Sequence, residues 1–107
     1  MKKITKQYRQ GDVLLHPVAA LPAEAQPVKA ATRIVLAEGE QTGHAHAIQP
    51  KRGQVKQWLA GTELYLEVRQ PVTLEHEEHA LATVEPGIYH VRRQVEVWMD
   101  EVRQVSD

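Results

Sequence analysis

Histidines are the residues of this chain best suited to chemistry, and there are 6 of them among 107 residues. Two of these, His44 and His46, stand two positions apart between small residues (GHAHA). In a β-strand, side chains at positions i and i+2 point to the same face, so these imidazoles are predicted to project side by side. Such a pair can reach one metal ion, and the small neighbours leave room for the ion and its water. The alternative is a pair of polar histidines on a solvated strand face.

A second cluster lies at residues 75–79 (EHEEH), where five consecutive side chains are charged or able to bind a metal. If the preceding strand runs straight, His76 and Glu78 point towards the interior. If it turns at Glu77, His79 swings inward instead. The alternative is a charged loop between two strands, which is a common arrangement.

Taken together, the two clusters predict one metal site with three imidazole nitrogens and a carboxylate. That donor set suits zinc, iron, nickel, manganese or copper. The predicted ligands are His44, His46 and either His76 or His79, with Glu78 as the candidate fourth. Three protein ligands leave an open coordination position, as in catalytic sites, whereas four protein ligands are typical of structural sites.

Three classes of function are compatible with these histidines. In an enzyme, the ion would lower the pKa of a bound water or polarise a substrate oxygen, with Glu77 or Glu78 as the catalytic base. A small-molecule substrate is then expected. In a non-catalytic binding module, the metal would be structural or absent. In an interaction protein, the histidines would titrate near pH ~6.5 and tune an interface.

The remaining histidines lie outside the two clusters. His90 falls in an alternating segment, where a single histidine is more often a packed or surface residue than a ligand; ligation is the alternative. His16 precedes Pro17 and is predicted to be structural or exposed. Arg92 and Arg93 are predicted to lie on a solvated face, with anion binding as the alternative.

Composition excludes several other chemistries. The chain has no Cys, which excludes disulfides, thiolate zinc sites and cysteine nucleophiles. Its one serine, Ser106, leaves little room for a Ser-His-Asp enzyme. Lys and Arg number 13 against 14 Asp and Glu, so no nucleic-acid partner is expected. No apolar run approaches the about 20 residues of a membrane helix, and the N-terminus lacks the apolar part of a signal peptide. We therefore expect a cytoplasmic protein with no membrane partner.

Most apolar stretches are short and alternate with period 2, which predicts an all-β fold. We expect one domain over residues 1–107, a small barrel or sandwich of about nine short antiparallel strands. The predicted strands are 12–18, 32–37, 43–48, 54–60, 63–69, 72–76, 81–84, 88–98 and 102–105. The best hairpin candidate joins 54–60 to 63–69 through Gly61. A helix is the alternative for 92–105, and an exposed sheet edge would allow a homodimer.

The first histidine pair resembles a motif of the cupins, small β-barrel proteins that hold a metal ion. In this chain Gly39 precedes His44 and His46 much as in the first cupin motif. Residues 86–90 (PGIYH), followed by Gln94, resemble part of the second motif, in which a late histidine supplies the last ligand. The resemblance implies a cupin-like, metal-binding β-barrel.

This chain departs from the cupin pattern at one ligand. The glutamate that follows the second histidine in cupins would fall at Pro50 or Lys51, and the 75–79 segment could replace it. The segments LAEGEQTGHAH, LEHEEHA and EPGIYHVRRQ also resemble a set of small bacterial proteins of unknown function with the same order of motifs. That resemblance supports treating the two histidine clusters as one site.

Overall fold

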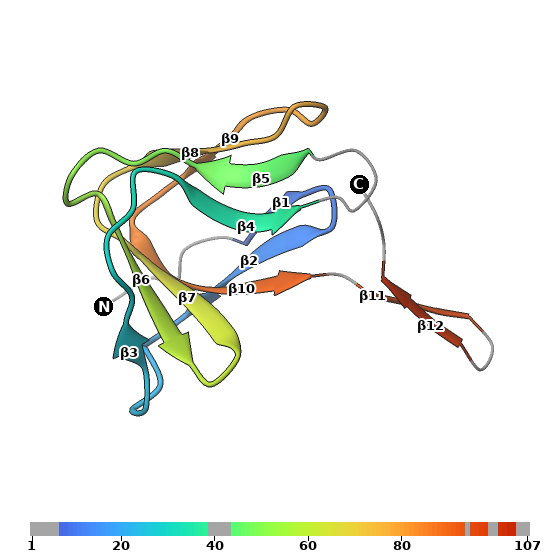
Figure 1. Ribbon diagram of the computed structural model, residues 1–107, viewed down its shortest axis with the longest axis horizontal. Helices are drawn as coiled ribbons and strands as arrows, with labels where there is room; N and C mark the ends of the chain where they lie inside the picture. The colour runs from blue at the N-terminus through green and yellow to red at the C-terminus, as the bar shows by residue number, and fades with distance from the viewer. Residues whose placement is uncertain (1–6, 39–43, 94, 99–100, 105–107) are drawn as a thin grey trace.

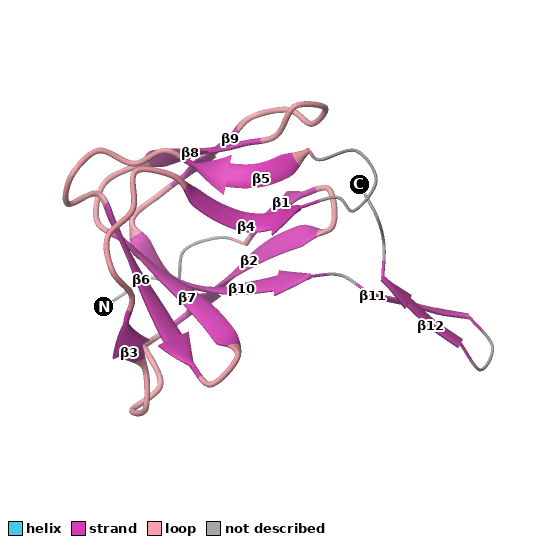
Figure 2. Cartoon of the chain, viewed as in Figure 1, coloured by secondary structure: helices cyan, strands magenta, loops and turns pink. Residues whose placement is uncertain are grey.

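The computed structural model describes residues 7–38, 44–93, 95–98 and 101–104, and every regular element in these ranges is a β-strand (Figure 2). The strands are β1 (Tyr8–Gln10), β2 (Val13–Val18), β3 (Gln26–Pro27), β4 (Ile34–Glu38), β5 (Ala45–Ile48), β6 (Val55–Ala60), β7 (Glu63–Val68), β8 (Val72–Glu75), β9 (Ala82–Val84), β10 (Gly87–Arg93), β11 (Val95–Trp98) and β12 (Glu101–Gln104). Within the described ranges, no helix has the length and apolar character needed to cross a membrane.

Ten of these strands form two antiparallel sheets that make a sandwich (Figure 1). The larger sheet has the order β1-β2-β10-β7-β6-β3, and the smaller has the order β4-β5-β8-β9. The prediction of a small all-β fold with short antiparallel strands is confirmed, and the sandwich is the correct alternative. Neither sheet closes on itself within the described ranges, so the fold is not a closed barrel.

The predicted hairpin is present as β6 and β7. Their register runs from Val55 opposite Val68 to Ala60 opposite Glu63, which leaves a two-residue turn. Gly61 occupies the first turn position with φ of 65°, a left-handed conformation that glycine adopts without a steric penalty. This glycine, together with the alternation of the flanking strands, explains why the hairpin could be predicted from the sequence.

The structure also contains strands that period-2 alternation did not predict. β1 has three residues and β3 has two, which is too short to show alternation. β1 joins β2 through another two-residue turn, where Gly11 has φ of 57°. The C-terminal strands were predicted by alternation and are present in place of the alternative helix: residues 95–98 and 101–104 pair with each other in a separate two-stranded sheet.

The core lies between the two sheets. Fully buried Leu15, Leu66 and Tyr89 come from the larger sheet, and fully buried Ile48 and Leu74 come from the smaller one. Along β2 and β8, buried apolar residues occupy every second position, as expected for strands with one inward face, whereas all four residues of β5 are buried. Burial of this apolar surface is the main force that holds the two sheets together.

The short strand β1 is anchored to the core by its tyrosine. The ring of Tyr8 packs edge-on against Tyr89 with 5.8 Å between centroids, and its hydroxyl accepts the Glu85 N–H at 3.1 Å. Gln10 has the same parity as Tyr8, so it also points inward and is 4% exposed. Packing of Tyr8 thereby places a polar side chain, Gln10, at the inner side of the sandwich.

Candidate metal centre

Strand pairing brings two histidines from distant parts of the sequence together. β5 pairs with β8 in antiparallel register, with Ala47 opposite Glu75. One position further along, His46 and His76 therefore face each other, and their ring centroids are 4.3 Å apart. Both rings are buried, with 0% of His46 and 6% of His76 exposed.

His79 completes a group of three imidazoles. One ring nitrogen from each of His46, His76 and His79 lies within 4.8 Å of the other two. The ring of His79 is 4.5 Å from that of His76 and 5.6 Å from that of His46. Nitrogens bound to one zinc ion at ~2.1 Å cannot be more than ~4.2 Å apart, so small inward rotations would allow all three to bind.

His44 belongs to a second group, which shares His76 with the first. One ligand atom from each of His44, His76 and Glu77 lies within 4.8 Å of the others. His44 precedes β5, its ring is 5.7 Å from that of His76, and it is partly exposed. The structure thus brings all four predicted histidines close together, but it places His44 and His46 in different groups.

The two predicted catalytic glutamates lie on the exposed side of these groups. Glu77 Oε1 accepts the Ala45 N–H at 2.9 Å. This hydrogen bond is the main cause that lowers the pKa of Glu77 below its usual value; its own N–H and the charges of His44 and His76 add to the effect. Glu78 Oε2 lies 3.4 Å from His44 Nδ1, and its side chain is 59% exposed.

The backbone of the same segment contacts His76. The Glu78 N–H donates to His76 Nδ1 at 3.0 Å, so a neutral ring carries its proton on Nε2. Binding through Nε2 would require that proton to move to Nδ1, and binding through Nδ1 would replace the Glu78 N–H. Either mode breaks this hydrogen bond, so we expect residues 76–79 to rearrange when an ion binds.

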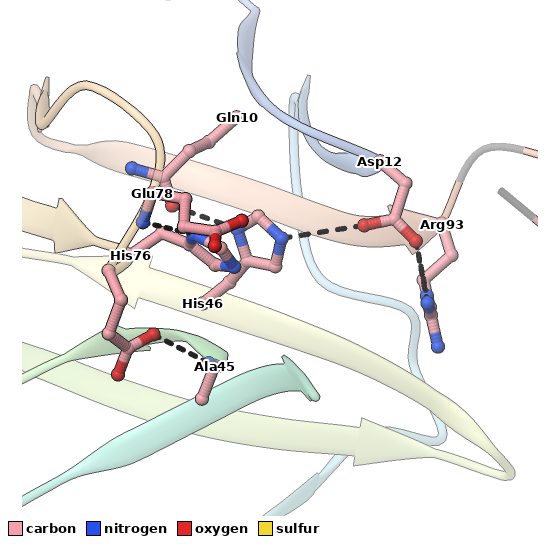
Figure 3. A network of polar contacts seen from close by, with 8 residues as sticks. Gln10, Asp12, Ala45, His46, His76, Glu78 and Arg93 are labelled. Carbon is pink, nitrogen blue, oxygen red and sulfur yellow. Dashed lines mark hydrogen bonds and ion pairs between the residues drawn. The ribbon is translucent and has the colours of Figure 1, made fainter. Parts of the chain in front are cut away.

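Three residues that the sequence did not single out for this site surround His46 (Figure 3). Gln10 Oε1 lies 2.9 Å from His46 Nδ1. The Asp12 carboxylate is fully buried, and its Oδ1 lies 3.4 Å from His46 Nε2. Its other oxygen accepts two hydrogen bonds from Arg93, at 3.0 and 2.6 Å. Arg93 is therefore a half-buried ion-pair partner and not a solvated residue, whereas Arg92 is exposed as predicted.

A hollow of about 260 Å³ opens beside His76 and Glu77. Residues of β5 and β8 contribute to its lining, which includes both acidic and basic side chains. Its lining consists of Arg33, Ala45, Ala47, Gln49, Glu75, His76, Glu77 and Leu81. A small molecule in this hollow would be adjacent to the shared histidine.

Fold and site together define a two-sheet antiparallel β-sandwich with a histidine cluster that could hold a metal ion. The chain belongs to the family described as the domain of unknown function DUF8820, whose family model matches residues 9–94. The matched range includes the four clustered histidines together with Gln10, Asp12 and Arg93. No curated protein and no solved structure matches the chain. The cupin resemblance therefore stays a prediction, and Gly39 of its first motif lies outside the described residues.

Proposed function

We propose that this protein binds one divalent metal ion through His46, His76 and His79. The observation that carries the proposal is the convergence of three imidazoles within 4.8 Å, two of them buried. Imidazole donors favour zinc, iron, nickel or copper over magnesium or calcium.

Three protein ligands leave at least one coordination position for water or a substrate oxygen, which is the arrangement of catalytic metal sites. The hollow beside His76 supplies space for a small-molecule substrate on that side. Of the two candidate bases, Glu77 is held by the Ala45 N–H, whereas the Glu78 side chain lies beside His44 and is 59% exposed. Glu78 is therefore the candidate base in metal-dependent hydrolysis or a similar reaction, with Glu77 fixed by its hydrogen bond.

The burial of His46 and His76 favours a second candidate function, a structural ion in a non-catalytic binding module. In that case a fourth protein donor closes the coordination sphere. Gln10 Oε1, which already lies 2.9 Å from His46 Nδ1, is the candidate for that donor. The two functions differ in whether an exchangeable water remains bound to the ion.

The direct test is metal content and metal-dependent stability. The protein is purified without a histidine tag, and its metal is measured by mass spectrometry. We expect about one equivalent per chain after reconstitution, and a rise in melting temperature with zinc, nickel, iron(II) or manganese, because the ion binds only the folded state. Water exchange at the manganese-loaded protein, measured by proton relaxation, then separates an open site from a closed one. Less than about a tenth of an equivalent and no rise in melting temperature would refute the proposal.

A further inference from the structure

His46 is held from both sides of its ring by side chains that are themselves fixed. On one side, the Gln10 amide donates to the carbonyl oxygens of Leu74 at 3.0 Å and Ala80 at 2.9 Å. These two bonds orient the amide so that its oxygen faces His46 Nδ1. On the other side, Arg93 holds the Asp12 carboxylate through two hydrogen bonds to Oδ2, which leaves Oδ1 facing His46 Nε2.

The two ring nitrogens of His46 point in different directions relative to the cluster. In Figure 3 the Nδ1 side of the ring lies towards Gln10 and His76, and the Nε2 side points away from His76 to Asp12. Neither of the ligand groups found among the described residues includes Asp12. Nδ1 is therefore the nitrogen on the His76 side in this view, and Nε2 faces the buried carboxylate.

We propose that Asp12 is a positioning residue for the metal centre, and that His46 binds the ion through Nδ1. The inference rests on the proposed function. A neutral imidazole that binds a metal through one nitrogen carries a proton on the other, and a carboxylate commonly accepts that N–H. Asp12 Oδ1 accepts the Nε2–H, which keeps the lone pair on Nδ1. The two atoms are 3.4 Å apart in this structure, and the proposal requires this distance to shorten when an ion binds.

In this structure Gln10 Oε1 accepts from His46 Nδ1, because the Gln10 amide nitrogen donates to Leu74 and Ala80. An ion at Nδ1 would replace that hydrogen bond, and the proton of the neutral ring would then lie on Nε2. Asp12 makes this arrangement favourable because a buried N–H needs an acceptor. Arg93 compensates the negative charge that Asp12 would otherwise bring into the interior. Asp12 thus favours the form of His46 that leaves Nδ1 for the ion.

Nuclear magnetic resonance of the zinc-loaded, ¹⁵N-labelled protein tests which nitrogen is bound. In long-range ¹H–¹⁵N spectra, Nε2 couples strongly to both carbon-bound ring protons, whereas Nδ1 couples strongly to only one. We expect His46 to show a protonated Nε2 and a metal-shifted Nδ1. Zinc on Nε2 would overturn the inference but leave the three-histidine site intact. No zinc binding at all would refute the proposed function itself.

A pair of matched variants tests the role of Asp12. We expect Asp12→Asn to weaken zinc binding by about 10- to 100-fold, because the neutral amide is a poorer acceptor for the Nε2–H. The control is Glu63→Gln, which makes the same change in the carboxylate that contacts His90, and it should leave zinc affinity unchanged. An equal affinity for the two variants would overturn the role of Asp12. If Asp12→Asn does not fold, the wild-type spectrum still decides the orientation of His46.

Discussion

His90 and His46 each contact a carboxylate, but in very different surroundings. His90 lies on β10, where its ring stacks on Tyr65 at 4.7 Å and its Nε2 contacts Glu63. Its Nδ1 accepts a hydrogen bond from Arg92 at 2.9 Å. His46 contacts Asp12 but is fully buried, and two further imidazoles converge on it.

The difference lies in what stands around each ring. His90 is satisfied by side chains from its own strand and the neighbouring strand, and neither ligand group of the described residues contains it. Its cross-strand neighbour is His16, so a histidine pair in register across two strands is not enough to make a site. At His46 the donors come from β5 and from the segment after β8. Convergence of three donors, and not contact with a carboxylate, distinguishes the candidate metal centre.

The largest effect should come from breaking the buried ion pair beside His46. Arg93→Met leaves the Asp12 carboxylate buried without its main partner, so we expect a loss of about 3 kcal/mol in the free energy of unfolding. This is the lower end of the range for buried pairs, because 29% of the Arg93 side chain is exposed. Urea unfolding of the metal-free protein measures it.

The matched change in the carboxylate beside His90 should lower the free energy of unfolding much less. Glu63→Gln removes an exposed contact of His90, for which about 1 kcal/mol or less is expected. Equal losses in the two variants would contradict the contrast between the buried and the exposed carboxylate.

Substitution of a proposed metal ligand should lower metal affinity, whereas the same substitution at His90 should not. His79→Gln removes one of three nitrogen donors, and we expect zinc binding to weaken by more than about 100-fold. This exceeds the usual effect of replacing a residue that only hydrogen-bonds to a metal ligand. His90→Gln should leave the affinity within about twofold, since it changes a ring outside both groups. Titration calorimetry measures both. If the two substitutions weaken binding equally, the metal site is not where we place it.

Acid should remove the effect of the metal. Ligating imidazoles must be neutral, and a free histidine has a pKa near ~6.5, so protons compete with the ion. The metal-induced rise in melting temperature should therefore be large at about pH 8 and fade below about pH 6.5. A rise that is equally large at about pH 5 would mean that carboxylates such as Glu75, Glu77 and Glu78 hold the ion.

A smaller pH effect is expected from Glu77 in the metal-free protein. Its pKa is lowered in the folded state, mainly by the Ala45 N–H, relative to about 4.3 in an unfolded chain. The ionised group therefore stabilises the fold above about pH 4.3, and this contribution is lost as the pH falls through the lower, folded-state pKa. Glu77→Gln should flatten the acid limb of stability measured by urea unfolding. Glu24→Gln, in an exposed loop, is the control, and an identical acid limb in both variants would contradict the expectation.

The sequence predicts those parts of the fold and site that depend on neighbours along the chain. The β6–β7 hairpin follows from alternation and Gly61, and the two histidine clusters follow from their spacing. The opposition of His46 and His76 depends on the register of β5 with β8, which no local pattern specifies. Alternation could not distinguish a barrel from a sandwich. That distinction depends on strand order, which is set by long-range packing.

The residues around His46 were beyond prediction for the same reason. Asp12 and Arg93 are 81 positions apart, and only the pairing of β2 with β10 brings them together. Gln10 lies in a strand of three residues, too short to reveal which face is buried. A sign remains in the sequence: Gln10 and Asp12 flank Gly11 at a turn between stretches whose other inward residues are apolar. Polar side chains that are buried at this turn need hydrogen-bond or ion-pair partners, and such a polar network is a sign of a functional site.

X-ray absorption spectroscopy of the zinc-loaded protein tests the central claim most directly, because it counts the imidazoles bound to the ion. We expect a first shell with three imidazole nitrogens at ~2.0–2.1 Å, together with one or more oxygen donors such as water or an amide oxygen. His79→Gln should reduce the imidazole count to two, whereas His90→Gln should leave it at three. A shell made of oxygen donors alone, or an imidazole count that falls with His90 and not with His79, would contradict the three-histidine site.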